Sequence, residues 1–179
     1  MTLIEQLALL QTETATLPDG AVVQFRRAGN AAAPVSHVLL HGIGSASASW
    51  LAQLQAAQHG AAANVHVLAW DAPGYGASTP VGPRAPTAAD YATRLWTWLD
   101  GEAAATQAVT LVGHSLGAMM AAAATCQVPR RVARLVLLAP ALGYASASAE
   151  LREKKLADRL VNLTNLGPCL LYTSPSPRD

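Results

Sequence analysis

The stretch Val109-Thr110-Leu111-Val112-Gly113-His114-Ser115-Leu116-Gly117 does most to decide the fold of this 179-residue chain. Its first four residues, rich in Val and Leu, predict a short buried strand, and the alanine-rich run that follows predicts a helix. The pattern Gly-x-Ser-x-Gly between them permits a sharp turn, because Gly113 and Gly117 leave room for neighbouring backbone. Such a turn strains Ser115 and raises its hydroxyl above the sheet, at the N-terminus of a helix.

The same alternation of strand and helix extends over most of the chain. Short runs rich in Val and Leu predict strands at 21–28, 35–40, 65–70, 109–112 and 135–138, and the stretches between them predict helices at 49–59, 87–100 and 116–128. Asp19-Gly20 predicts a hairpin between 13–17 and 21–28. The expected fold class is therefore α/β: a mostly parallel sheet with helices on both faces and an antiparallel N-terminal edge.

Charge and cysteine content exclude several classes of function. The chain has 12 Lys and Arg against 11 Asp and Glu, and this balance gives no field that would attract nucleic acid. Its two cysteines form neither a disulfide framework nor a zinc site, so we expect no metal, no cofactor and a reducing compartment. The sequence carries no signal for an oligomeric state. The expected partner is a small-molecule substrate.

A membrane or secreted location is also not expected. The most apolar long window, 108–128, contains a histidine, a serine, two glycines and a glutamine, which a membrane span would seldom hold. The N-terminus lacks the basic start and the long apolar run of a signal peptide. We therefore expect a cytoplasmic protein.

A second glycine-rich turn follows the predicted strand 35–40, at His41-Gly42-Ile43-Gly44. Loops after parallel strands meet at the carboxyl edge of the sheet, so a backbone N–H here, that of Ile43, could join the N–H of Leu116 to hold an oxyanion. Gly42-x-Gly44 also approximates a dinucleotide fingerprint. It lacks the third glycine, and the next acidic residue, Asp71, comes 29 positions after Gly42, so nucleotide binding is the weaker interpretation.

A third loop, Asp71-Ala72-Pro73-Gly74-Tyr75-Gly76-Ala77-Ser78, consists of turn residues, and we interpret Asp71 as structural. Together the three loops resemble the α/β-hydrolase superfamily, in particular its small cytoplasmic bacterial esterases, enol-lactonases and C–C bond hydrolases. The resemblance implies that Ser115 is a nucleophile and that the N–H groups of Ile43 and Leu116 form an oxyanion hole. It implies supporting roles for the flanking residues His41, Gly42, Gly113, His114 and Gly117.

The chain departs from that family pattern in one respect. In the α/β-hydrolase fold a histidine base follows the nucleophile in the sequence, whereas all five histidines here precede Ser115. The acids after Ser115 are Glu150, Glu153, Asp158 and Asp179, and none is assigned as catalytic. We therefore expect a C-terminally truncated hydrolase, with 1–140 as part of the core and 141–168 as the start of a lid. Residues 169–179 resemble translated sequencing adapter and are expected to be foreign to the gene.

The predicted function is that of a serine hydrolase acting on a small ester, lactone or similar carbonyl compound through an acyl-enzyme on Ser115. This fragment, lacking acid and base, is expected to be inactive. Alternatives are a non-catalytic binding module of the same fold and, less favoured, a nucleotide-binding oxidoreductase. The resemblance also implies that dehalogenases and epoxide hydrolases would carry a carboxylate in place of Ser115. Finally, strand 135–138 is expected to form an apolar, aggregation-prone sheet edge.

Overall fold

A computed structural model describes residues 3–60, 64–82, 86–102, 104–141, 148 and 150 of the chain. The residues up to 140 belong to one compact unit, Met1–Pro140, and those after it to a second, Ala141–Asp179. Most of the predicted lid and the whole tail 169–179 lie outside the described residues.

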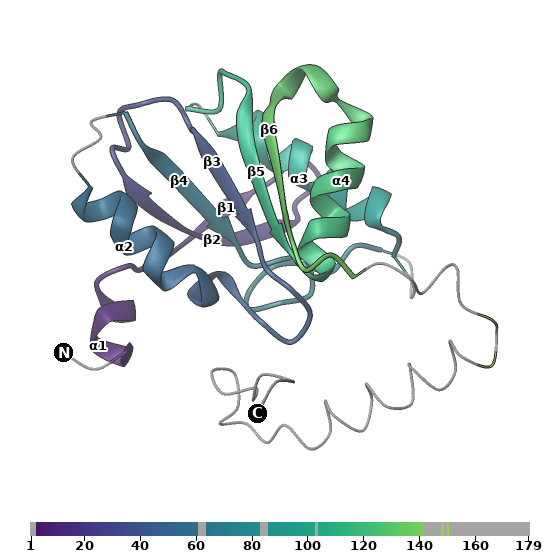
Figure 1. Cartoon of the computed structure of the whole chain (residues 1–179), viewed down its shortest axis with the longest axis horizontal. Helices are drawn as coiled ribbons and strands as arrows, with labels where there is room; N and C mark the ends of the chain where they lie inside the picture. Colours follow the sequence, from purple (N-terminus) through teal and green to yellow (C-terminus); the bar gives the residue numbers. More distant parts are fainter. Residues whose placement is uncertain are drawn as a thin grey trace. The chain divides into compact units, whose positions relative to one another are not determined.

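The first unit is built on a six-stranded sheet with the order β1-β2-β4-β3-β5-β6 (Figure 1). The strands are β1 (Thr12–Thr16), β2 (Val22–Gly29), β3 (His37–Leu40), β4 (His66–Trp70), β5 (Val109–His114) and β6 (Val132–Leu138). The pairs β3–β4, β3–β5 and β5–β6 are parallel, while β1–β2 and β2–β4 are antiparallel. This mixed sheet confirms the predicted α/β class with its antiparallel N-terminal edge.

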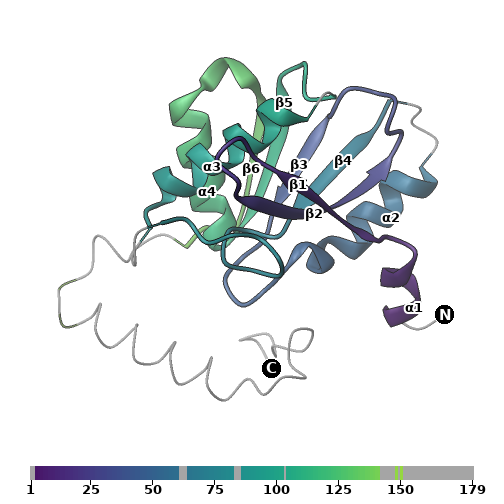
Figure 2. The ribbon, with the colours of Figure 1, turned by 180° about the vertical axis from the view of Figure 1, so that it is seen from behind.

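Helices cover both faces of the sheet, as predicted (Figures 1 and 2). They are α1 (Leu3–Ala8), α2 (Leu51–His59), α3 (Ala88–Gly101) and α4 (Leu116–Gln127), with single 3-10 turns η1 (Ser47–Trp50) and η2 (Pro129–Arg131). Helix α3 begins with a capping box, in which the side chain of Thr87 accepts the Asp90 N–H and the Asp90 carboxylate accepts the Thr87 N–H. Helix α1 is too short to give a periodic signal and was not predicted.

Alternation along the central strands divides the core between the two faces. Val38, Leu40, Leu68 and Trp70 pack with α3 and α4, in a cluster that includes Trp98. Their neighbours along the strands point the other way and pack with α2 in a smaller cluster. Beside α2 a groove of about 380 Å³ stays open, lined by residues that include Leu39, Trp50, Val112 and Leu138.

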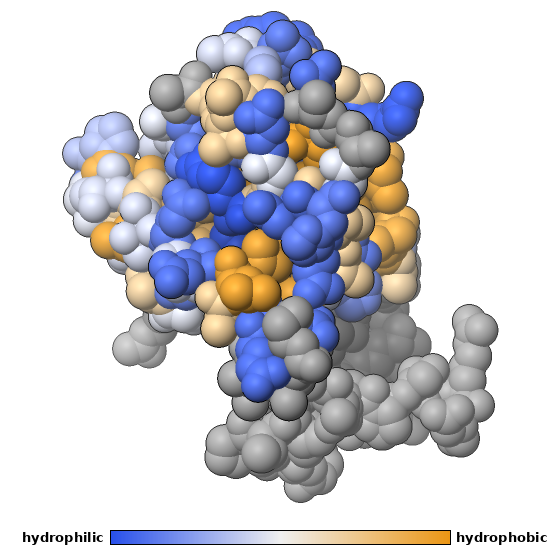
Figure 3. Space-filling view, turned by 90° about the vertical axis from the view of Figure 1, so that its left-hand side faces the viewer, coloured by the Kyte–Doolittle hydropathy of each residue, from blue (hydrophilic) through white to orange (hydrophobic). Residues whose placement is uncertain are grey.

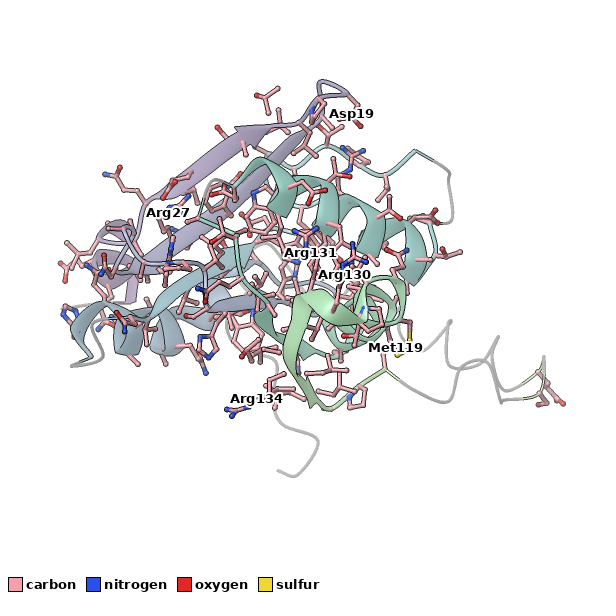
Figure 4. The ribbon with its side chains drawn as sticks, turned by 90° about the horizontal axis from the view of Figure 1, so that it is seen from above. Asp19, Arg27, Met119, Arg130, Arg131 and Arg134 are labelled. Atoms are coloured by element: carbon pink, nitrogen blue, oxygen red, sulfur yellow. The ribbon has the colours of Figure 1, made fainter. Side chains whose placement is uncertain are left out.

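Strand β6 is one of the two edges of the sheet within the described residues, opposite β1, and it corrects one sequence expectation. The predicted strand 135–138 has no charge, but the observed strand starts at Val132 and so includes Arg134. Figure 4 shows the Arg134 side chain pointing away from the ribbon. The apolar edge itself is as expected, because Leu135, Leu137 and Leu138 are 36%, 41% and 42% exposed.

The surface at the α1 and α2 end of the molecule is mostly hydrophilic (Figure 3). A hollow of about 680 Å³ opens beside α1, β1 and α2, and its lining includes Gln6, Gln55, Gln58, Glu13 and Arg27. Among the helices of the described part, none is both long and apolar enough to cross a membrane.

Candidate active site

The sharp turn predicted at Ser115 is present between β5 and α4. Ser115 has φ 53° and ψ −112°, one of two non-glycine residues with positive φ among those described. Its N–H donates to the Leu138 carbonyl at 2.9 Å, and its own carbonyl accepts the Ala118 N–H at 3.2 Å. Bonds on both sides therefore hold a backbone conformation that is unfavourable for a residue with a side chain.

Close packing explains the two glycines that flank this turn. A Cβ atom at Gly113 would lie 2.6 Å from the backbone N of Ala118. One at Gly117 would lie 2.6 Å from the His41 carbonyl oxygen and nearer still to that of Leu40. The strand β3, which ends in Leu40, thus approaches α4 as closely as backbone allows, and the prediction that small residues are needed here is confirmed.

The loop after β3 lies against Ser115. A Cβ atom at Gly42 would be 3.1 Å from the Ser115 Cβ and 3.1 Å from the His114 Nδ1. The structure therefore brings together two loops whose contacting residues, Gly42 and Ser115, are 73 positions apart in the sequence. Within the described part of the chain, the N–H groups of Ile43 and Leu116 have no hydrogen-bond acceptor. For Leu116 the cause is its place as the first residue of a helix.

His41 is buried beneath this loop and both of its ring nitrogens are occupied. Nε2 accepts the Ala72 N–H at 2.9 Å, so Nδ1 carries the proton and donates to the Gly42 carbonyl at 2.7 Å. Burial lowers the pKa of His41, while the hydrogen bond to Gly42 and the negative charge of Asp71 oppose that shift. His41 is thus a neutral support of the loop at neutral pH and has no nitrogen free to act on Ser115.

The loop after β4 supports the same region from the side. The buried carboxylate of Asp71 accepts the Ser47 N–H at 2.6 Å, which ties the β4 loop to the start of η1. The Ser78 hydroxyl donates to the Asp71 carbonyl at 2.6 Å and accepts the Gln24 N–H at 2.9 Å. These contacts agree with the interpretation of Asp71 as structural. Sequence reasoning missed Ser47, because nothing local marks a contact made 24 residues away.

The remaining histidines lie elsewhere. His66 is buried in β4 between the Ala33 carbonyl and the Arg27 guanidinium, and His37 contacts the Ser36 hydroxyl. His59 ends α2, and His114 is exposed. In the described residues no histidine or acid hydrogen-bonds Ser115, and no group of three His, Cys, Asp or Glu residues could hold a metal ion. The described residues therefore present a strained serine and two N–H donors, with no base hydrogen-bonded to the serine.

Comparison with known proteins places this geometry in a family. The model of the alpha/beta hydrolase family matches residues 38–174. A curated relative, 2-hydroxy-6-oxononadienedioate/2-hydroxy-6-oxononatrienedioate hydrolase 2 of Pseudomonas putida, is 34% identical over 109 residues, which cover 61% of this chain and 37% of the relative.

Solved structures share the fold. The crystal structure of a membrane phospholipase A, a bacterial virulence factor, is similar with a TM-score of 0.70 and 22% identity, over 87% of this chain and 50% of that one. Epoxide Hydrolase A from Mycobacterium thermoresistibile gives a TM-score of 0.60 and 27% identity, over 72% of this chain and 38% of that one. The chain spans half or less of the length of these three proteins. The family match, which includes both the β3 loop and the turn at Ser115, shows that the chain belongs to the alpha/beta hydrolase family.

Proposed function

We propose that this chain carries the nucleophile and the oxyanion hole of a serine hydrolase that acts on a small ester, lactone or related carbonyl compound. The observation that carries the proposal is the strained turn at Ser115, packed against the Gly42 loop at the start of a helix. The N–H groups of Ile43, which follows Gly42 in that loop, and of Leu116, which follows Ser115, have no acceptor in the described part of the protein.

The proposed chemistry follows from this arrangement. The Ser115 oxygen attacks the substrate carbonyl carbon as its hydroxyl proton passes to a general base, which the described residues do not provide. The negative charge that develops on the carbonyl oxygen is stabilised by the two N–H donors. Helix α4 holds the Leu116 N–H in place, so this donor needs little rearrangement as the charge forms. The protonated base gives its proton to the leaving group, which departs from the tetrahedral intermediate. The base then takes a proton from water, which attacks the acyl-enzyme, and returns that proton to the Ser115 oxygen as the acid is released.

The substrate class is inferred from the nucleophile and from the curated relative. The relative's name describes hydrolysis of a 6-oxo diacid, and an oxo group is a carbonyl. The family resemblance associates epoxide and haloalkane chemistry with a carboxylate nucleophile, whereas this chain has Ser115. We therefore favour a carbonyl substrate, despite the similarity of fold to epoxide hydrolases.

The 179-residue chain by itself should be almost inert. No histidine follows Ser115 in the sequence, and the hydroxyl of an unassisted serine is a weak nucleophile at neutral pH. The rate of p-nitrophenyl acetate hydrolysis by this chain should therefore show no inflection near neutral pH, where a histidine base would titrate. Such an inflection would mean that one of the five upstream histidines acts as the base.

The test of the nucleophile is Ser115→Ala in the complete gene product. The kcat for an activated ester should fall by a factor on the order of 10³ to 10⁶, with an unchanged melting profile. Ser49→Ala is the matched control, because Ser49 lies in the neighbouring turn η1 and is exposed. A fluorophosphonate should label the parent and the Ser49 variant but not the Ser115 variant. Near-normal esterase activity in a natively folded Ser115→Ala protein would exclude the proposal.

Two further measurements, mixing with the activated ester and titration with NAD, separate the alternatives. A binding module of this fold would release no burst of p-nitrophenol on mixing with the activated ester. An oxidoreductase would bind NAD tightly in a fluorescence titration, which a serine hydrolase has no reason to do.

A further inference from the structure

We propose that Tyr75 is a positioning residue, which orients the loop that carries the oxyanion N–H of Ile43. The inference rests on the proposed function for its catalytic meaning, but the contacts that support it belong to the structure. Tyr75 lies in the loop after β4, outside every role considered so far.

The loop at 41–44 has few bonds of its own. Ile43 is 39% exposed, and Gly44 is exposed with a positive φ of 69°. Between the buried His41 and the buried Ser47, only two hydrogen bonds of residues 42–44 exist in the described part of the chain: the Gly42 carbonyl accepts from His41, and the Gly44 N–H donates to the Tyr75 hydroxyl at 3.4 Å.

These two bonds orient successive peptide planes. A peptide unit is planar and trans, so the Gly42 carbonyl and the Ile43 N–H point in opposite directions within one plane. The His41 bond to the Gly42 carbonyl therefore directs the Ile43 N–H away from His41. The next plane holds the Gly44 N–H, which the Tyr75 hydroxyl fixes. With both neighbouring planes held, the backbone dihedrals at Ile43 have little freedom.

Tyr75 also supports the first of these bonds through its ring. The Tyr75 and His41 rings meet edge to face, with centroids 4.8 Å apart and an interplanar angle of 78°. The loop thus has one side chain, Tyr75, that contacts the histidine below it and the amide near its tip.

Tyr75 is itself held well enough to act as a support. Its N–H donates to the Ala72 carbonyl at 2.8 Å, and its carbonyl accepts the Ser78 N–H at 2.9 Å. The Ser78 hydroxyl connects in turn to the Gln24 N–H of β2 and to the Asp71 carbonyl. The backbone at Tyr75 is therefore anchored through a tight turn to the sheet.

The experiment compares Tyr75→Phe and Tyr75→Leu with Tyr91→Phe in the full chain. Tyr91, on α3, is a matched control: it is also partly buried and near enough to Tyr75 for their charges to interact, but its hydroxyl makes no hydrogen bond in the described structure. The first measurement is amide hydrogen exchange by NMR. Tyr75→Phe should speed exchange at Gly44 by about three- to tenfold, the range expected for one modest hydrogen bond, and leave β3 unchanged.

The second measurement distinguishes positioning from simple structural support. Phenylboronic acid can accept the Ser115 oxygen and form a tetrahedral anion that resembles the proposed intermediate, whereas benzamide stays planar and uncharged. Tyr75→Phe should weaken the boronic acid about three- to tenfold and leave benzamide binding unchanged. Tyr75→Leu should add a change in the ¹⁵N shifts of the His41 ring, because the edge contact is lost. Tyr91→Phe should match the parent throughout.

The outcomes are separable. If Tyr75→Phe leaves Gly44 exchange and boronic acid affinity at parental values, or weakens both ligands equally, the assignment of Tyr75 is wrong. If the parent forms no boronate while Tyr75→Phe still speeds exchange at Gly44, the role of Tyr75 in oxyanion binding is wrong and its structural role on the loop stands. The proposed function is decided separately, by fluorophosphonate labelling of Ser115 in the complete gene product.

Discussion

Two regions of the molecule invert the usual distribution of polar and apolar residues in opposite ways. Five polar residues are buried in the described part of the chain, and four of them gather around the Ser115 loops: His41, Ser47, Asp71 and Ser78. Five large hydrophobic residues are exposed, and three of them lie on the edge strand β6: Leu135, Leu137 and Leu138.

The difference shows what each inversion requires. A polar group can be buried when it finds a partner, and His41 and Asp71 each accept a hydrogen bond from a backbone N–H of a neighbouring loop. The Ser78 hydroxyl bonds to the Asp71 carbonyl and the Gln24 N–H, whereas the Ser47 hydroxyl has no partner in the described residues. Exposed leucines on a strand edge have no such compensation, and they mark either an interaction surface or a risk of aggregation. The region around the Ser115 loops is therefore fixed by its own contacts. The behaviour of the exposed leucines on β6 depends instead on what packs against them.

The largest expected effect comes from disturbing the fixed region. Gly117→Ala places a Cβ against the carbonyl oxygens of Leu40 and His41, which are backbone atoms and cannot turn aside. The free energy of unfolding should fall by about 2–3 kcal/mol. Gly101→Ala, at the end of α3 with open space around it, should be neutral or stabilising by up to about 1 kcal/mol. Urea unfolding measures both, and equal effects would disprove the close approach of β3 to α4.

A smaller effect should come from protonating His41. Because burial lowers its pKa from 6.5 in the folded protein, the unfolded chain binds more protons between the folded value and 6.5. The free energy of unfolding should therefore be fully maintained above about pH 6.5 and decrease as the pH falls below it. His37 contributes in the same direction, since burial and then the charge of Arg134 lower its pKa.

The two histidines can be separated by substitution. His37→Gln should keep the part of the pH dependence of the unfolding free energy that comes from His41. His41→Gln should remove a larger part of that dependence. It should also lower stability, because the bond from the Ala72 N–H changes. Stability curves from urea titrations at several pH values between 5 and 8 give the slopes. Stability that rises on acidification in the parent would contradict the argument.

The smallest effect on folding should come from the exposed edge. Leu137→Lys changes a side chain that is 41% exposed, so the unfolding free energy should shift by no more than about 0.5 kcal/mol. Its effect on association should be large by comparison, because a charge on an edge strand opposes pairing between sheets. Light scattering after size-exclusion chromatography should show less concentration-dependent aggregation than the parent. A parent chain that runs as a sharp monomer with a cooperative thermal transition would refute the expectation of an aggregation-prone edge.

Sequence patterns predicted the fold well where local signals are strong. The strands 35–40 and 65–70 were found because a buried parallel strand reads as a continuous apolar run, and all five residues of β4 are buried. The start of β6 was missed because Arg134 interrupts its apolar run. Arg134 belongs to the strand because it pairs with Thr110 of β5, and Val132 pairs with Val109 on the other side of a register shift. Pairing of this kind depends on partners distant in the sequence.

The candidate site likewise combines features that the local sequence predicts with contacts that it does not. Glycines at 42, 113 and 117 predicted the two turns, because glycine permits backbones to approach closely. The groups that Gly42 and Gly117 approach are distant in the sequence and could not be named from it. The contacts of Ser47 with Asp71 and of Gly44 with Tyr75 join residues 24 and 31 positions apart and carry no local pattern. They arise only when the sheet brings the β3 and β4 loops to the same edge.

The tryptophans of this core give the protein an optical property of its own. Trp50, Trp70, Trp96 and Trp98 are all at most 6% exposed, so their fluorescence should lie at shorter wavelength than that of indole in water. Trp70 and Trp98 stack with their ring centroids 6.3 Å apart on the α3 face, whereas Trp50 lies beside the open groove near α2. Replacing Trp50 alone would leave an emission that reports the α3 face, and the difference from the parent would report the α2 face. Loosening of one layer of the molecule could in this way be followed separately from loosening of the other.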